Sequence, residues 1–245
     1  MLRLLSLAVF LATWWIAALL VGNAKLPAPP AVLATTISEA ESGALFLHLG
    51  ATLARVALAF VLAMTLGSAI GYLMGRVRLA NRLGDPWLIL LLNLPALVVI
   101  VLAYIWAGLT EVAAIAAIAI NKLPTAVVML REGTRALDPA LDEMAAAFAI
   151  PRGRAFRHVV LPQLAPYIAA AARSGLSLVW KIVLVAELLG RPNGVGFEIG
   201  VAFQLFDIPL LLTYSLSFAA VVLVIETLLV QPFETRVSRW RLRAA

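Results

Sequence analysis

The sequence contains no cysteine and two histidines, His48 and His158. The absence of cysteine excludes a disulfide framework, a thiolate metal site and a cysteine nucleophile. Charged residues are also scarce, at 13% of the 245 residues, whereas soluble domains have about 25%. So few charges cannot cover the surface of a globular protein of this size. The composition therefore excludes an ordinary soluble enzyme, a disordered protein and a nucleic-acid-binding module, although the isoelectric point is near 10.3.

Hydrophobic residues make up 63% of the chain and gather in long runs. A helix needs about 20 mostly apolar residues to cross the hydrocarbon core of a bilayer. Six runs approach or reach this length, at residues 4–21, 56–74, 87–110, 112–130, 168–190 and 208–230. The runs are continuous, whereas the strands of a membrane barrel would alternate apolar and polar residues. The sequence therefore predicts an all-α polytopic membrane protein, with six spans in one transmembrane domain over residues 1–245.

The first run has a second interpretation. Arg3 before it, and the small residues Gly22 and Ala24 after it, are also found in cleaved signal peptides. The apolar region of a signal peptide is about 7–15 residues long, and this run is longer. We expect the run to be retained as a membrane helix, with cleavage as the alternative.

Lysine and arginine are distributed unevenly between the two sets of loops. Most of them lie in the loops of one side, namely Arg3, Arg76, Arg78, Arg82, Arg131, Arg135, Arg152, Arg154, Arg157, Arg236, Arg239, Arg241 and Arg243. The opposite loops hold Lys25 and Arg191. Because positively charged loops stay in the cytoplasm, we predict that both termini are cytoplasmic and that residues 23–55, Glu111 and residues 191–207 face outward.

Two patterns inside the spans concern helix packing. Gly67, Gly71 and Gly75 recur every four residues, and small residues at this spacing let two helix backbones approach closely. We expect them to pack helices within the bundle, and a seam between two chains is the alternative. Pro95 and Pro124 lie within predicted spans, where each removes a backbone donor and can kink its helix.

The segment 131–166 is the least apolar stretch between spans. Asp138 and Pro139 are typical of a helix N-cap and first helical position, so a short helix is predicted over residues 140–150. Residues 151–153 (Pro-Arg-Gly) break it, and a second short helix is predicted over 154–161, ending at Leu161-Pro162. Such a pair of helices suits docking to another protein. A solvated connector between spans is the equal alternative on composition alone.

Two stretches of this segment carry a resemblance to a known family. Residues 143–149 (EMAAAFA) and 156–162 (FRHVVLP) resemble the cytoplasmic EAA signature of ABC importer permeases, with the spacing from Glu to Leu-Pro intact. The outer loop after the first span, the glycine stripe and residues 184–196 are similar as well. The likeness covers nearly the whole chain and is greatest to permeases of the nitrate, sulfonate and taurine type. Met144 departs from the usual alanine, and Ala149 from the usual glycine.

The resemblance implies a division of labour among subunits. This chain would be a type I importer permease of the bacterial inner membrane, would bind no cofactor, and would leave ATP and Mg²⁺ to two cytoplasmic ATPase subunits. It would work beside a second permease subunit, as a homodimer, and with an external substrate-binding protein. Residues 138–162 would form the coupling loop, with ATPase contact from Glu143, Ala145, Ala149, Pro151, Arg152, Gly153, Leu161 and Pro162. We expect the bend to move to residues 151–153 because alanine avoids the positive φ that glycine allows.

Four charges lie inside or beside the predicted spans. Lys122 and Lys181 lie near the middle of theirs, and two cations at one depth would attract an anion on a translocation path. The alternative is that each lysine is held by an internal pair or by backbone carbonyls. Arg173 and Glu226 lie near the cytoplasmic ends of two spans, and we predict a structural ion pair within about 6 Å. Glu187, near an outer end, is expected to order the glycine-rich loop after it.

Three classes of function are compatible with a polytopic membrane protein of this composition. The leading interpretation is a permease subunit, which agrees with the absence of a Gly-x-x-x-x-Gly-Lys-Ser/Thr phosphate loop from the sequence. An ion-coupled secondary transporter is the second, although such proteins often contain internal inverted repeats. An intramembrane enzyme is the third, and it would need a cluster of nucleophile and base inside the spans. Neither histidine lies within a predicted span.

Overall fold

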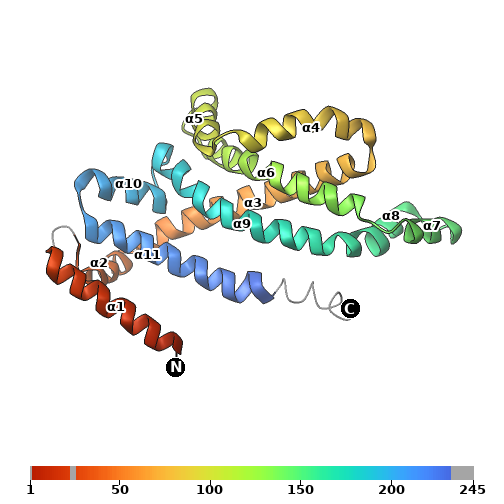
Figure 1. Ribbon diagram of the computed structural model, residues 1–245. Helices are drawn as coiled ribbons and strands as arrows, with labels where there is room; N and C mark the ends of the chain where they lie inside the picture. Colours follow the sequence, from red (N-terminus) through yellow and green to blue (C-terminus); the bar gives the residue numbers. More distant parts are fainter. Residues whose placement is uncertain (1, 23–25, 233–245) are drawn as a thin grey trace. The chain divides into compact units, whose positions relative to one another are not determined.

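The computed structural model describes residues 2–22 and 26–232, and this part of the chain is helical without strands (Figure 1). The α-helices in chain order are α1 (Leu2–Val21), α2 (Pro29–Glu41), α3 (Ala44–Arg76), α4 (Arg78–Asn93), α5 (Ala96–Ala107), α6 (Glu111–Arg135), α7 (Pro139–Ala147), α8 (Arg152–Ala155), α9 (Leu161–Gly190), α10 (Val195–Leu205) and α11 (Ile208–Ile225). Two π-helical turns are η1 (Phe156–Val160) and η2 (Glu226–Val230). Lys25 and the basic run 236–243 lie outside the described residues.

Within residues 2–22 and 26–232, four stretches are long and apolar enough to cross a membrane, at Ala44–Arg76, Glu111–Arg135, Arg152–Gly190 and Ile208–Leu228. The pair α4 and α5 adds a fifth if the two helices together form one span. In the first predicted span, Leu11–Val21 forms a shorter apolar stretch of α1. The all-α membrane fold is thus confirmed, whereas the predicted count of six spans is not.

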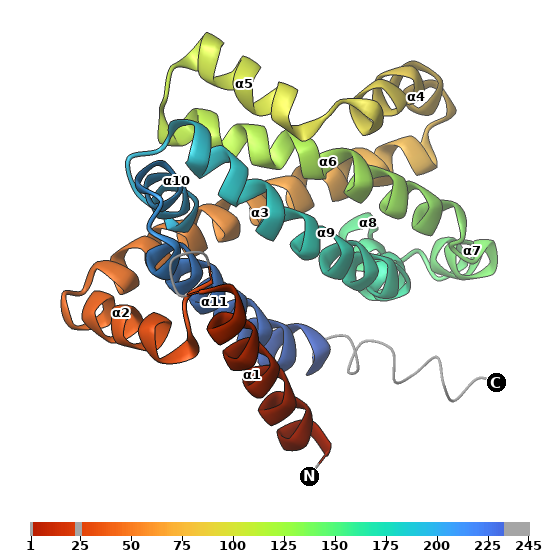
Figure 2. The ribbon, with the colours of Figure 1, turned by 60° about the vertical axis from the view of Figure 1, so that its left-hand side comes forward.

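The third predicted span, 87–110, is not one continuous helix. Helices α4 and α5 meet at a bend of 100° (Figure 2). Leu94 is extended with ψ 127°, as expected for a residue before proline, and Pro95 becomes the N-cap of α5 rather than an interior kink. Asn93 closes the last turn of α4 because its Nδ2 donates to the Ile89 carbonyl at 2.8 Å. Pro124, by contrast, lies inside α6 as predicted.

The chain divides into two compact units, which we describe separately. One consists of residues 55–183 and 224–245. In it, the glycine stripe of α3 lies directly against α6. A Cβ atom on Gly71 would lie 2.6 Å from the Val127 carbonyl oxygen, and one on Gly75 would lie 2.4 Å from Thr134 Cβ. The glycines therefore pack helices within the chain, as predicted.

The other unit consists of residues 1–54 and 184–223. Helix α2 begins with prolines at its first positions and lies beside α11, since Thr213 donates to the Val32 carbonyl at 3.3 Å and Tyr214 donates to Glu39 at 2.7 Å. The glycine-rich loop after Arg191 leads into α10. This helix ends at Phe206, which adopts a left-handed φ of 55°.

The second short helix predicted in the segment 131–166 does not end at Leu161-Pro162. Instead, α8, η1 and α9 form one continuous stretch from Arg152 to Gly190. The π-turn explains how the helix passes Pro162, which has no backbone N–H and whose ring crowds the carbonyl four residues earlier. Within η1 the Leu161 N–H bonds to the Phe156 carbonyl instead, one residue further back than in an α-helix.

Candidate functional site

Helix α7 begins where the sequence predicts. Asp138 is its N-cap, accepting a hydrogen bond from the Ala140 N–H at 2.9 Å, and Pro139 is the first helical residue. A capping aspartate accepts a hydrogen bond from one of the free N–H groups of the first turn. Its negative charge also interacts favourably with the positive end of the helix dipole. The start of α7 is therefore fixed by its own sequence.

Helix α7 ends at Ala147, and the chain turns at Ala149, so the expectation that the bend would move to residues 151–153 is wrong. Ala149 takes a left-handed φ of 48°. The Ile150 N–H donates to the Ala145 carbonyl and the Ala149 N–H donates to the Ala146 carbonyl, both at 2.9 Å. These two bonds form a Schellman cap, whose left-handed position is usually glycine. The two bonds stabilise a conformation that costs an alanine free energy.

Helix α7 is tied to both of its neighbours within the unit. Arg76, the last residue of α3, lies 2.6 Å from Asp142 of α7. At the other side, Gln163 of α9 accepts from the Asp138 N–H and donates to the Val159 carbonyl, each at 3.0 Å. These bonds connect α7 to the end of α3 and to the start of α9.

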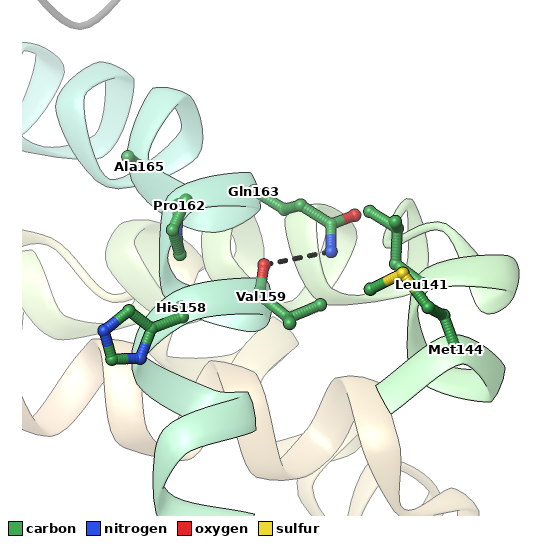
Figure 3. A pocket seen from close by; sticks show the side chains of 7 residues that line it. All are labelled: Leu141, Met144, His158, Val159, Pro162, Gln163 and Ala165. Atoms are coloured by element: carbon green, nitrogen blue, oxygen red, sulfur yellow. Dashed lines mark hydrogen bonds between the residues drawn. The ribbon is translucent and has the colours of Figure 1, made fainter. Parts of the chain in front are cut away.

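A cavity of about 510 Å³ lies between α7 and the first turns of the α9 stretch (Figure 3). Its lining is mostly apolar and consists of Leu141, Met144, His158, Val159, Pro162, Gln163 and Ala165. Pro162 thus lines the cavity rather than ending a helix.

The residues predicted to contact an ATPase differ in exposure. Ala145 lies on the buried face of α7. The other residues are exposed, namely Glu143, Ala149, Pro151, Arg152, Gly153, Leu161 and Pro162. Sequence reasoning noted Met144 as a departure from the signature but assigned neither Met144, which is 41% exposed, nor Phe148, which is 76% exposed, to the contact surface. Their spacing of four residues on a helix was the available signal.

Lys122 is fully buried within α6. Its side chain lies against Gly175 of α9, where an added Cβ would come within 1.8 Å of Lys122 Cε. Its Nζ atom has no hydrogen-bond partner among the residues that the structure describes. A buried ammonium without a partner is costly, so this position is an unusual one for a lysine.

The other predicted charges lie in different surroundings. The Lys181 side chain is exposed, unlike that of Lys122. Arg173 Nε lies 3.8 Å from Glu226 Oε1, within the distance that a direct ion pair requires. The sequence did not predict a second ion pair, which has shorter contacts. Arg55, only 3% exposed, binds Glu111 through both carboxylate oxygens at 2.8 and 2.6 Å.

In the unit of residues 1–54 and 184–223, Glu187 holds the glycine-rich loop, as its position predicts. It is fully buried and accepts from the Thr52 hydroxyl at 2.9 Å and from the Gly196 N–H at 2.8 Å. A Cβ atom on Gly194 would lie 2.4 Å from the Glu187 carboxyl carbon. The glycines therefore allow the loop backbone to reach the carboxylate.

His48 extends this cluster. Its Nδ1 accepts from the Gly194 N–H at 3.0 Å, and its Nε2 lies 3.1 Å from Glu198 Oε1. Burial raises the pKa of the Glu198 carboxyl, and the nearby His48 works in the opposite direction. The imidazole thus links the loop to α10, a role that the sequence did not reveal.

Several relatives match almost the full length of the chain, and three of them illustrate the range. A probable ABC transporter permease protein of Brucella abortus is 30% identical over 243 residues, covering 99% of this chain and 96% of its own. A protein of Bacillus subtilis named as an aliphatic sulfonates transport permease is 32% identical over 240 residues, covering 97% and 87%. The taurine transport system permease protein TauC of Escherichia coli is 26% identical over 242 residues, covering 96% and 88%.

The family model that matches residues 63–231 covers the glycine stripe of α3, Lys122, the α7 segment and the spans that follow. It describes inner-membrane components of binding-protein-dependent transport systems. This agrees with the apolar helices and with the signature at residues 143–162. The chain therefore belongs to the binding-protein-dependent transport system inner membrane component family, the permease subunits of ABC transporters.

Proposed function

We propose that this chain forms the translocation path of an ATP-driven importer for a small anion. The names of two relatives specify aliphatic sulfonates and taurine, and these support a sulfonate-like solute. Nitrate, the small inorganic anion named for another relative, is the alternative solute. Two copies of the chain would form the path, and an external binding protein would deliver the solute. ATP and Mg²⁺ would be used by a separate ATPase.

The observation that carries this proposal is the exposed face of residues 138–162. Phe148 and Met144 project from a short helix outside the long apolar spans, next to the exposed carboxylate of Glu143. Large apolar side chains of this kind mark protein–protein contacts, and a central aromatic side chain commonly dominates their binding energy. The ATPase is the partner that the family supplies for this face.

The bonds around α7 support a mechanism for coupling. Closure of the ATPase pair on ATP would displace α7. The ion pair between Arg76 and Asp142 and the hydrogen bonds of Gln163 would carry this displacement to α3 and α9. Movement of helices as rigid bodies is a common form of such switching. ATP-dependent transport would separate this mechanism from an ion-coupled secondary transporter, which would work on an ion gradient alone.

The first test replaces the exposed aromatic residue of α7. Phe148→Ala should reduce the amount of ATPase that copurifies with the permease by about tenfold, because burial of a central aromatic anchor is lost. Phe203→Ala is the matched control, since Phe203 is 68% exposed on α10. Equal ATPase recovery with both variants, or uptake that continues on an ion gradient without ATP hydrolysis, would overturn the proposal.

Lys122 and Lys181 are proposed to line the anion path. The unpartnered and buried Nζ of Lys122 supports this, because an anion would supply the missing partner. Lys181 is exposed and would contribute a more accessible positive charge.

The second test neutralises each lysine in turn. Lys122→Gln and Lys181→Gln should each lower uptake of taurine or an aliphatic sulfonate by about tenfold or more, since each removes a positive charge proposed to contact the anion. ATPase recovery serves as the measure of intact assembly. Lys122→Met retains the length of the side chain and controls for packing against Gly175. Undiminished uptake in both glutamine variants would remove the lysines from the path.

A further inference from the structure

A second cavity, of about 360 Å³, lies at the basic ends of α3, α4 and α6. It is separate from the cavity of Figure 3 and shares none of its lining residues. Its lining consists of Met74, Gly75, Arg78, Asn81, Arg82 and Arg135. Three guanidinium groups around one polar cavity form an environment suited to an anion.

Among the residues that the structure describes, two of these arginines have no carboxylate partner. Arg78 and Arg82 form no ion pair with any residue in the ranges 2–22 and 26–232, whereas the neighbouring arginines do: Arg76 pairs with Asp142, Arg131 with Asp85, and Arg135 with Glu132. The positive charge of Arg78 and Arg82 is therefore left uncompensated at this end of the helices. They are four residues apart and share one face of α4.

The surface beside this face is apolar. Leu79, Leu83 and Trp87 follow one another at four-residue intervals along α4, and their side chains are 65%, 66% and 68% exposed. A helix with a basic face and an exposed apolar stripe is typical of the membrane interface. A molecule seated here would meet positive charge at one end and an apolar surface along its body.

We propose that this cavity binds the phosphate of an anionic phospholipid. The guanidinium forks of Arg78 and Arg82 donate to the phosphate oxygens, with Arg135 as a third donor from α6. The acyl chains lie along Leu79, Leu83 and Trp87. Basic pockets between membrane helices bind lipid headgroups by the same chemistry. Free phosphate carries the same charge as the headgroup but has no acyl chains to contact Leu79, Leu83 and Trp87.

The experiment measures lipid binding by the purified full-length chain with native mass spectrometry. The probes are phosphatidylglycerol, phosphatidylcholine and inorganic phosphate. The wild-type chain should prefer phosphatidylglycerol over phosphatidylcholine by about thirtyfold, the effect expected of two charge contacts. The double variant R78Q/R82Q should lose this preference. The variant R154Q/R157Q removes the same charge from exposed arginines outside the cavity and should keep it.

Three results would overturn the proposal. One is a full preference for phosphatidylglycerol in R78Q/R82Q. Another is an equal loss in R154Q/R157Q, which would indicate diffuse attraction to a basic surface. The third is binding of inorganic phosphate as tight as that of phosphatidylglycerol, which would make free phosphate the ligand. Thermal unfolding of each variant verifies that it is folded, and Arg82→Lys provides a charge-conserving variant that should retain partial preference.

Discussion

At the scale of the residue, Ala149 stores backbone strain at the end of α7. An L-residue in the left-handed conformation costs about 1–2 kcal/mol, and glycine avoids this cost. Ala149→Gly should therefore stabilise the end of α7 by about 0.5–1 kcal/mol, allowing for the greater freedom of glycine in the unfolded chain. The measurement is hydrogen exchange of the amides of residues 144–150, which should slow about two- to fivefold.

The neighbouring alanine supplies the control with the opposite sign. Ala147 is the last helical residue of α7, where glycine lowers helix stability by about 0.5–1 kcal/mol. Ala147→Gly should thus speed exchange of the same amides. If the two variants changed exchange in the same direction, the left-handed strain at Ala149 would not be the cause.

Single residues also mark what the sequence could reveal of the site. Asp138 and Pro139 specify the start of α7 through local chemistry, so their roles were predictable. Glu187 could be assigned to its loop because it precedes a glycine-rich stretch. His48 could not, because its partners Gly194 and Glu198 are about 150 residues away in the chain. Contacts at such separation leave no local signal in one sequence.

At the scale of the element, the close contact of α3 with α6 depends on glycine. A Cβ atom on Gly71 would lie 2.6 Å from the Val127 carbonyl oxygen and 2.8 Å from Leu130 Cβ. Backbone cannot yield as a flexible side chain does, so Gly71→Ala should push the helices apart. We expect a loss of about 1–3 kcal/mol, seen as a lower unfolding temperature of the detergent-purified protein.

Gly50→Ala is the matched control on the same helix. Apart from its chain neighbours and the backbone of its own helix turn, no atom in the described part of the chain lies within 4 Å of a Cβ at Gly50. Alanine there should raise helix stability by up to about 1 kcal/mol, since glycine is the weaker helix former. An equal loss in both variants would mean that glycine acts through backbone freedom in α3 and not through contact with α6.

Element boundaries were less predictable than element type. The sequence indicated a kink at Pro95, but a proline can lie inside a helix or cap one, and local pattern does not distinguish these cases. Pro95 caps α5, and Asn93 closes α4. At Leu161-Pro162 the error was the opposite one: the sequence predicted the end of a helix, but the π-turn at η1 lets the helix continue through the proline. Both outcomes depend on packing around the proline.

At the scale of the whole molecule, the family and the membrane fold were predictable because they rest on features spread along the entire chain. The apolar runs identify membrane helices by composition alone, and the signature at 143–162 keeps its spacing. The function of Lys122 was not predictable to the same degree. The role of a buried lysine depends on which group binds its Nζ. When that group belongs to a solute or to a second subunit, a single sequence does not identify it.

Orientation in the membrane is a property of the whole chain, and its test follows from the charge distribution. The chain has no cysteine, so single cysteines can be introduced without background. Ser42 and Arg154 are both exposed. A membrane-impermeant maleimide should label Ser42→Cys in intact cells, because the segment 23–55 is poor in positive charge and is predicted to face outward. Arg154→Cys should be labelled after permeabilisation only, because the basic segment 131–166 is predicted to face the cytoplasm. The reverse labelling pattern would show that the orientation is opposite to the predicted one. Phe148 would then lie on the outer side, where no cytoplasmic ATPase could bind it.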